Sequence, residues 1–247
     1  MRRYRGSVAR RRSRPEEGRR ALLDAGRALV YERPVGATLE HVRVTDVAAR
    51  AGVTVGAVYH YWPSQEEYRA ALVEDLLSPS RYPAWRAVAA TLPDEGEVPL
   101  LAAVRTAARL SRESMEASDD IRVTLGFWAA GDHDLGERLA NQYREVDEGW
   151  VAVYRAVLDR HGLEPRPPFT HHHLAAVLTA LIDGLHVRGS LDPQAVPVHV
   201  ADVDGEPWDL LGAAALAFLT SATRLVGADD DDLWARGARW AAGERRG

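Results

Sequence analysis

The stretch from Val44 to Gln65 reads VTDVAARAGVTVGAVYHYWPSQ and predicts two short helices joined by a tight turn. Gly52 is expected to end the first helix, and Thr54 has a side chain suited to cap the second. Pro63 stops the second helix, because a proline disfavours helical backbone at the residue before it. The apolar residues expected to fix the angle between the two helices are Val47, Ala48, Ala51, Val53 and Val58.

Helical periodicity extends in both directions from this stretch. A capping box at Ser13–Glu16 predicts a helix that runs to about Val30, and Ser64 predicts the cap of a helix that runs to about Leu77. Beyond Pro79 the sequence predicts only helices, because leucine and alanine dominate and no strand pattern occurs. The later predicted helices are Trp85–Leu92, Val98–Ala117, Asp120–Ala130, Asp134–Arg160, His171–Arg188, Trp208–Arg224 and Asp230–Ala242, with a loop at Gly189–Glu206.

These elements predict an all-α fold in two domains, which suits a chain of 247 residues. Residues 1–14 are expected to be a disordered basic arm. Residues 15–78 are expected to form a three-helix domain that contains the helix-turn-helix. Residues 79–247 are expected to form a larger helical domain.

The two ends of the chain differ in charge. Residues 1–60 carry 13 arginines and 6 acidic residues, a net charge of +7, whereas residues 61–247 carry 18 arginines and 30 acidic residues, a net charge of −12. The first part therefore suits a polyanion, which the second part repels. Every basic residue is arginine, which the codon usage of a GC-rich genome is enough to explain.

Several classes of protein are excluded by what the sequence lacks. Without cysteine there is no disulfide framework, thiolate zinc site or cysteine nucleophile. The signatures of serine hydrolases, zinc proteases and nucleotide-binding enzymes are absent, so we expect no enzyme and no cofactor. No uninterrupted apolar run reaches about 18 residues, and no apolar run follows the basic start, which favours a cytoplasmic protein without a membrane partner.

Two clusters suggest metal binding only superficially. Successive helical residues point about 100° apart, so His171, His172 and His173 do not converge on one ion. The acidic run Asp229–Asp232 lacks the alternating ligands and the glycine of a calcium loop. We therefore expect no metal site.

The helix-turn-helix predicts contacts with double-stranded DNA, because the second helix of such a unit lies in the major groove. Gly56 and Ala57 allow close approach, and Ala57 suits contact with a thymine methyl group. Tyr59 and His60 lie further along and are placed to reach phosphates. A helical hairpin without a DNA role is the alternative, and the basic arm is either a free tail or a further DNA contact. The predicted DNA contacts are Thr45, Thr54, Val55, Gly56, Ala57, Tyr59, His60 and Gln65.

At these residues the chain resembles the TetR family of transcription regulators. The family pattern has a turn with Gly and Val, then Ser or Thr, a variable residue, Gly, a small residue, a branched residue, Tyr, an aromatic pair and Pro-Ser-Lys. Nearly all of it stands here, and the strong match covers about residues 20–77. The chain departs from the pattern where Gln65 replaces lysine, Trp62 replaces phenylalanine and Arg43 replaces the usual capping residue.

The resemblance implies a second domain that binds a small-molecule effector and forms a homodimer on a palindromic operator. It also implies a repressor, although activation stays open. The predicted helices His171–Arg188 and Trp208–Arg224 are apolar, and two from each subunit would form a four-helix bundle. The alternative is that both helices belong to the internal core. The short run Asp183–Leu185 is also typical of a late helix of the family.

Aromatic residues gather in the middle helices of the second domain. Tyrosine and tryptophan carry polar groups on large apolar rings, so they suit the wall of a ligand cavity. An aromatic stripe at helical spacing is also typical of plain core. An architectural DNA binder without a ligand is a further alternative, which the size of the second domain disfavours. The predicted ligand contacts are Phe127, Trp128, Tyr143, Trp150 and Tyr154.

Overall fold

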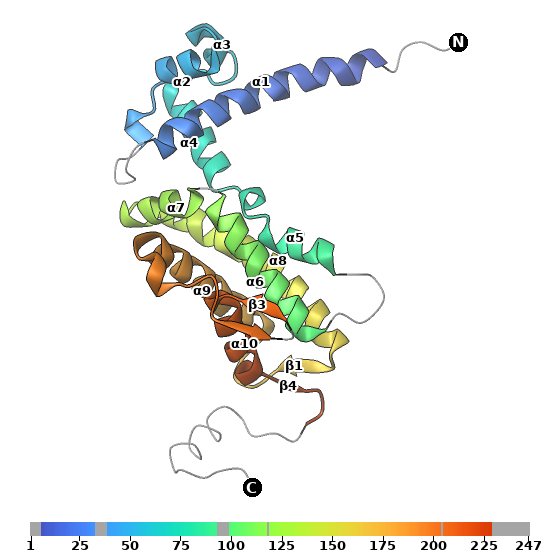
Figure 1. Cartoon of the computed structure of the whole chain (residues 1–247). Coiled ribbons are helices and arrows are strands. Elements are labelled where there is room, and N and C mark those ends of the chain that lie inside the picture. The colour runs from blue at the N-terminus through green and yellow to red at the C-terminus, as the bar shows by residue number, and fades with distance from the viewer. Residues whose placement is uncertain (1–5, 33–38, 93–98, 118, 204, 229–247) are drawn as a thin grey trace, which may run out of the picture. The chain divides into compact units, whose positions relative to one another are not determined.

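The computed structural model describes residues 6–32, 39–92, 99–117, 119–203 and 205–228 and is predominantly helical (Figure 1). This confirms the predicted all-α fold. The chain forms two compact units. The first contains Met1–Arg81 and Asp119–Ala140, and the second contains Tyr82–Ser118 and Asn141–Gly247.

The first unit is built around the helix-turn-helix. The predicted helix from Val44 to Ala51 is found with the same bounds, and its neighbours differ from the predictions by a few residues at most. The elements of this unit are α1 (Gly6–Tyr31), η1 (Leu39–His41), α2 (Val44–Ala51), α3 (Val55–Tyr59), α4 (Gln65–Leu76), η2 (Pro79–Arg81), α7 (Asp120–Ala129) and the first turns of α8 (His133–Arg160).

The N-terminal prediction needs a correction. The first helix starts at Gly6 rather than near Pro15, so residues 6–14 are helical where we expected a disordered arm. Arginine and alanine are strong helix formers, and the helix continues through Pro15 although this residue cannot donate a backbone hydrogen bond. Residues 1–5 lie outside the described part of the chain.

The boundary between the units also differs from the sequence-based prediction of a single change at residues 78–79. The first unit includes α7 and the start of α8, because Val123, Phe127 and Leu139 pack into the same core cluster as Leu22 and Leu72. Burying these apolar side chains joins two stretches of chain that are far apart in sequence.

Two helices of the first unit approach each other closely at a glycine. The hydroxyl of the fully buried Tyr68 on α4 donates a hydrogen bond to the carbonyl oxygen of Leu22 on α1, at 2.8 Å. Gly26 lies one turn further along α1, where a Cβ atom would overlap the Tyr68 hydroxyl and lie 3.1 Å from Leu72. The packing of α4 on α1 therefore depends on the absence of a side chain at residue 26.

In the second unit, α6 contacts α5, α9 and α10. Gly149 on α8 allows close packing against Trp85, since a Cβ at residue 149 would lie 2.5 Å from the indole ring. The elements of this unit are α5 (Ala84–Thr91), α6 (Leu100–Glu116), the rest of α8, α9 (His171–Leu191), η3 (Pro193–Ala195), α10 (Leu210–Ala222) and the strands β1 (Leu163–Pro165), β2 (Ala201–Val203), β3 (Glu206–Trp208) and β4 (Thr223–Leu225).

The predicted loop at Gly189–Glu206 is partly wrong. Helix α9 continues to Leu191, and β2 pairs antiparallel with β3, while β1 pairs with β4. Each strand has three residues, which is too short for a visible alternation of apolar and polar side chains. The predicted helix Asp230–Ala242 and the acidic run Asp229–Asp232 lie outside the described residues.

We predict that Gly26→Ala destabilises the first unit by about 1–3 kcal/mol, because the new methyl group overpacks the contact with Tyr68. Gly136→Ala on α8 is the matched control. A Cβ there meets nothing within 4 Å, so this variant should gain about 0.5–1 kcal/mol. Urea unfolding followed by circular dichroism measures both changes. Adding Tyr68→Phe to Gly26→Ala should recover part of the loss, and equal stability of wild type and Gly26→Ala would contradict the packing argument.

Candidate DNA interface and ligand cavity

The turn between α2 and α3 has the geometry that the sequence predicts. Gly52 has φ +68°, in the left-handed region that glycine adopts without strain. The N–H of Val53 donates to the carbonyl oxygen of Ala48 at 2.9 Å, which closes the end of α2. Thr54 then caps α3, because its hydroxyl accepts from the N–H of Ala57 at 3.3 Å. Local interactions therefore fix the direction in which α3 leaves the turn.

Helix α3 has one buried face and one open face. Val58 is fully buried between α2 and the core, whereas Gly56, Tyr59 and His60 are exposed. Val53, which we expected to help fix the angle between the two helices, is 43% exposed at the turn. Of the other predicted DNA contacts, Thr45 and Thr54 are exposed, and Val55, Ala57 and Gln65 are half-buried.

Gly56 is not required by the internal packing. A Cβ at this position meets only the Thr54 hydroxyl, at 3.9 Å, and the backbone there is not in the left-handed region. Alanine would be the better helix former at an exposed helical position. The small side chains at residues 56 and 57 therefore leave room for something outside the protein.

Two departures from the family pattern compensate for each other in the structure. Arg43 gives no side-chain cap to α2, which leaves the first N–H groups of that helix without an internal partner. The side-chain oxygen of Gln65 accepts from the N–H of Val44 at 3.3 Å and supplies the missing cap. Gln65 therefore fixes α4 to the start of α2, a supporting contact that sequence inspection missed.

A second contact from α4 holds the chain that leads into α2. The Arg69 guanidinium donates to the carbonyl oxygens of Val42, at 3.2 Å, and Glu40, at 2.6 Å. Charged donors make stronger hydrogen bonds to carbonyls than neutral donors do. Through these two hydrogen bonds, α4 positions the segment that leads into the helix-turn-helix.

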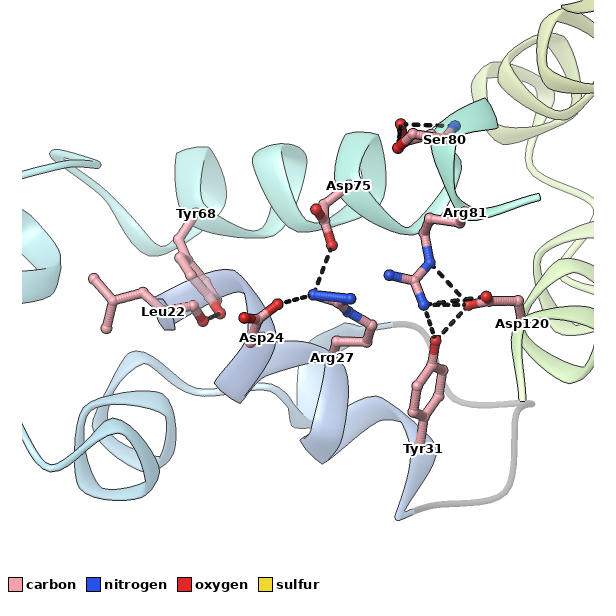
Figure 2. A network of polar contacts seen from close by, with 10 residues as sticks. Leu22, Asp24, Arg27, Tyr31, Tyr68, Asp75, Ser80, Arg81 and Asp120 are labelled. Atoms are coloured by element: carbon pink, nitrogen blue, oxygen red, sulfur yellow. Dashed lines mark hydrogen bonds and ion pairs between the residues drawn. The ribbon is translucent and has the colours of Figure 1, made fainter. Parts of the chain in front are cut away.

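A buried polar network fixes α7 within the first unit (Figure 2). Arg81 donates to both oxygens of Asp120, at 2.8 and 3.1 Å from Nη2, and to the Tyr31 hydroxyl at 2.7 Å. Tyr31 in turn donates to Asp120. Burial, followed by the hydrogen bond to Asp120, raises the pKa of Tyr31, so its hydroxyl stays protonated and available as a donor. The three residues are distant in sequence, and no local pattern announces their contact.

The second unit contains a cavity of about 280 Å³. Its wall is formed by side chains of α5, α6, α8, α9 and α10, together with Leu163 and Thr223 of the strands β1 and β4. Trp150 and Tyr154 on α8 stack in this wall with a centroid distance of 5.5 Å and an interplanar angle of 14°. The volume is close to the lower end of the range for small-molecule pockets, about 300 Å³.

Two hydroxyl groups in the wall have no hydrogen-bond partner among the described residues, those of Tyr154 and Ser111. Burial, and after it the charge of Asp147, raises the pKa of Tyr154, so the phenol stays neutral at physiological pH. Both hydroxyl groups can therefore bond to a ligand in the cavity.

The structure separates the five aromatic residues that we expected in one ligand site. Trp150 and Tyr154 line the cavity. Phe127 is buried in the core of the first unit, and Trp128, the next residue on α7, is 74% exposed. The Tyr143 hydroxyl donates to Asp183 at 2.9 Å and is not part of the cavity wall. The prediction of a single aromatic cluster is therefore corrected, because Phe127 and Trp128 belong to the first unit and the Tyr143 hydroxyl bonds to Asp183.

The rest of the wall consists of apolar side chains that sequence inspection did not single out. Residues such as Leu100, Ala103, Leu178 and Leu211 occur at helical spacing and look like ordinary core in the sequence. In the part of the chain that the structure describes, no group of three or more histidine, cysteine or acidic side chains is placed to hold a metal ion.

The most apolar 18-residue stretch of helix α9 has a mean hydropathy of 1.3, but only 22% of this stretch is buried inside the subunit. The length and composition of α9 alone would suit a membrane-spanning helix, although charged and polar residues interrupt its apolar run. Its exposed face is made of small and apolar residues, namely Ala176, Val177, Ala180 and Gly184. Large exposed apolar faces of this kind mark interaction sites in many proteins.

Two family models match the chain, and together they cover more than half of it. The model of the bacterial regulatory proteins of the tetR family matches residues 22–72, which contain the helix-turn-helix. The C-terminal model of the BetI-type transcriptional repressors matches residues 100–202. The chain belongs to the TetR family. It is a transcriptional regulator with a helix-turn-helix DNA-binding domain, in a family whose members are generally soluble repressors and homodimers and are generally not enzymes.

Several solved structures share the fold. A transcriptional regulator from Pseudomonas aeruginosa PAO1 is 23% identical, with a TM-score of 0.52 over 72% of this chain and 82% of that one. A Saccharomonospora viridis regulator in complex with choline is 18% identical, with a TM-score of 0.53 over 83% and 96%. SmeT in complex with triclosan is 19% identical, with a TM-score of 0.56 over 85% and 93%. No curated protein matches the sequence.

We predict that Gln65→Ala lowers the stability of the first unit by about 0.5–2 kcal/mol, because the N–H of Val44 loses its partner. DNA affinity should fall as well, since α2 supports the recognition helix α3. Gln65→Glu keeps an acceptor oxygen and serves as the control that retains stability. Thermal unfolding and DNA-binding assays of the three proteins measure these effects, and wild-type stability in Gln65→Ala would show that this cap is dispensable.

Proposed function

We propose that this TetR-family regulator is a homodimeric repressor that binds a palindromic operator and leaves it when a small molecule enters the second unit. The observation that carries the proposal is the occurrence, in one chain, of an open face on α3 and an apolar cavity with unpaired hydroxyl groups. We propose that it acts in the cytoplasm, with DNA and its own second copy as partners and without a membrane partner, a cofactor or a catalysed reaction.

The exposed face of α3 supports DNA contact through the major groove. Gly56 and Ala57 let the backbone approach base edges, and Ala57 contacts a thymine methyl group. Tyr59 and His60 bind phosphates, which fixes the register without specifying the sequence. Further proposed contacts are Thr45 at the start of α2, Thr54 and Val55 at the start of α3, and Gln65, whose amide can donate to a phosphate while its oxygen caps α2.

The exposed faces of α9 and α10 support a dimer. Both helices are strongly apolar, and α9 presents small side chains that allow a second helix to approach closely. Two helices from each subunit form a four-helix bundle with twofold symmetry. Such a dimer presents two α3 helices, which suits half-sites about 34 Å apart, one turn of DNA, or a multiple of that spacing.

Ligand release requires that the cavity and the DNA-binding unit share structural elements. Helix α8 runs from the first unit into the cavity wall, and α6, which lines the cavity, is followed by α7, whose Asp120 binds Arg81. A ligand shifts the balance between two states only through its different affinity for them. A coupling of about 1–3 kcal/mol weakens operator binding roughly 5–150-fold.

Two of the compared structures contain a bound small molecule, and each suggests a class of effector. The S. viridis regulator is in complex with choline, a quaternary ammonium ion, and SmeT is in complex with triclosan, an aromatic compound. For this chain, we propose that Trp150 and Tyr154 contact the effector, because they line the cavity. The other predicted contacts, Phe127, Trp128 and Tyr143, have no support from the cavity wall.

We predict that DNA selected from a random duplex pool contains a palindrome that the protein protects in a footprint. Ala57→Leu should abolish this specific binding, because the larger side chain keeps α3 out of the groove. Ala90→Leu, at an exposed position of α5, is the matched control and should bind normally. Normal operator binding by Ala57→Leu would show that α3 is not the recognition helix.

We predict that Gly184→Arg converts the dimer to a monomer. A Cβ at residue 184 meets nothing within 4 Å in the subunit, so the new side chain is accommodated unless a second subunit covers this face. Gly136→Arg, equally unhindered and on α8, should remain dimeric. Analytical ultracentrifugation gives the masses, and the monomer should also lose affinity for the palindrome. A dimeric Gly184→Arg protein would move the interface away from this face of α9.

A further inference from the structure

The wall of the cavity contains no charged side chain among the described residues that line it. The polar side-chain groups of the lining residues are four hydroxyls and the indole N–H of Trp150. Thr220 and Thr223 donate to the carbonyl oxygens of Ala217, at 3.0 Å, and Leu219, at 2.8 Å, within their own segment. The hydroxyls of the other two lining residues, Ser111 and Tyr154, are therefore the ones that remain free to bond to a ligand.

Several acidic residues lie close in sequence to the wall. Asp183 accepts from Tyr143 at 2.9 Å, and Glu164 accepts from Arg224 at 2.8 Å. Asp159 is exposed. Asp209 and Asp147 are also paired. Asp209, which precedes α10, accepts from the N–H of Gly212 at 2.7 Å and from Arg112 at 3.1 Å. Asp147, one turn before Trp150 on α8, accepts from the Thr179 hydroxyl at 3.2 Å. Neither residue lines the cavity, so neither supplies an unpaired negative charge to a bound cation.

The aromatic residues of the wall also do not form a cage for a cation. Such cages surround a cation with ring faces at angles to one another. Trp150 and Tyr154 are nearly parallel, at 14°, and each covers one face of the other. Burying an ion without a paired charge costs several kcal/mol, whereas an apolar molecule gains free energy from the same wall.

We infer that the effector is a small uncharged apolar molecule that carries one or two oxygen atoms, bonded by Tyr154 and Ser111, and that quaternary ammonium ions such as choline are excluded. The inference rests on the proposed function, since it assumes that this cavity is the effector site. The residues that line this cavity therefore predict a different class of ligand from the choline bound to the regulator of the same fold.

The test uses two molecules of almost the same shape. Choline and its carbon isostere, dimethylbutanol, both carry a hydroxyl group. Choline has a positively charged quaternary nitrogen where dimethylbutanol has a neutral quaternary carbon. Each competes with the neutral fluorescent dye N-phenylnaphthylamine for the full-length protein. We expect dimethylbutanol to displace the dye at a concentration at least ~30-fold lower than choline does.

The variants test the two hydroxyl groups and the location of the site. Tyr154→Phe and Ser111→Ala should each weaken dimethylbutanol binding by ~2–10-fold while the dye still binds, because each removes one hydrogen bond. Ala215→Phe fills the cavity from α10 and should abolish dye binding, with retained operator binding as evidence that the protein is folded.

The outcomes distinguish the effector class from the proposed function. Displacement by choline at the same or a lower concentration than dimethylbutanol overturns the inference and leaves a ligand-responsive repressor intact. Unchanged dimethylbutanol affinity in both hydroxyl variants overturns the assignment of Tyr154 and Ser111. Full dye binding by a folded Ala215→Phe protein shows that the cavity is not the ligand site, and the proposed function and the inference then fail together.

Discussion

The ion pair between Arg81 and Asp120 is the contact on which the first unit depends. The Asp120 side chain is 4% exposed and that of Arg81 is 15% exposed. Removing either partner leaves the other as an unpaired buried charge, which lowers the free energy of unfolding by about 3–5 kcal/mol. The Tyr31 hydroxyl bonds to both groups, which brings α1, η2 and α7 together (Figure 2). A segment that follows α6 in the chain is thereby fixed to the DNA-binding helices. The DNA-binding unit of this protein is consequently not a contiguous stretch of sequence.

Within that unit, α1 and α4 have supporting roles. Helix α1 provides Gly26, against which Tyr68 packs, and α4 supplies the amide of Gln65 and the guanidinium of Arg69 to the segment around α2. Helix α3 itself has only five residues and a single fully buried side chain, Val58. A helix of this length has little stability of its own, so its orientation comes from these surrounding contacts.

The second unit combines an internal cavity with an apolar outer face. Small side chains in the wall, such as Ala103 and Ala107, leave the space that larger residues would fill. The stacked rings of Trp150 and Tyr154 stiffen the α8 side of this space. Helix α8 also contributes Leu139 to the core of the first unit, so the same helix belongs to both units.

The sequence by itself determined the features that local interactions control. Gly52, Thr54 and Pro63 punctuate the helix-turn-helix, and their effects act within a few residues, so the bounds of α2 and the start of α3 could be predicted. Only the tertiary structure decided which distant segments meet. It assigned α7 to the first unit, placed Phe127 in that core, and left Trp150 and Tyr154 at the cavity. A sequence pattern gives the buried face of a helix but not its partner, because apolar burial is non-directional and any complementary face can supply it.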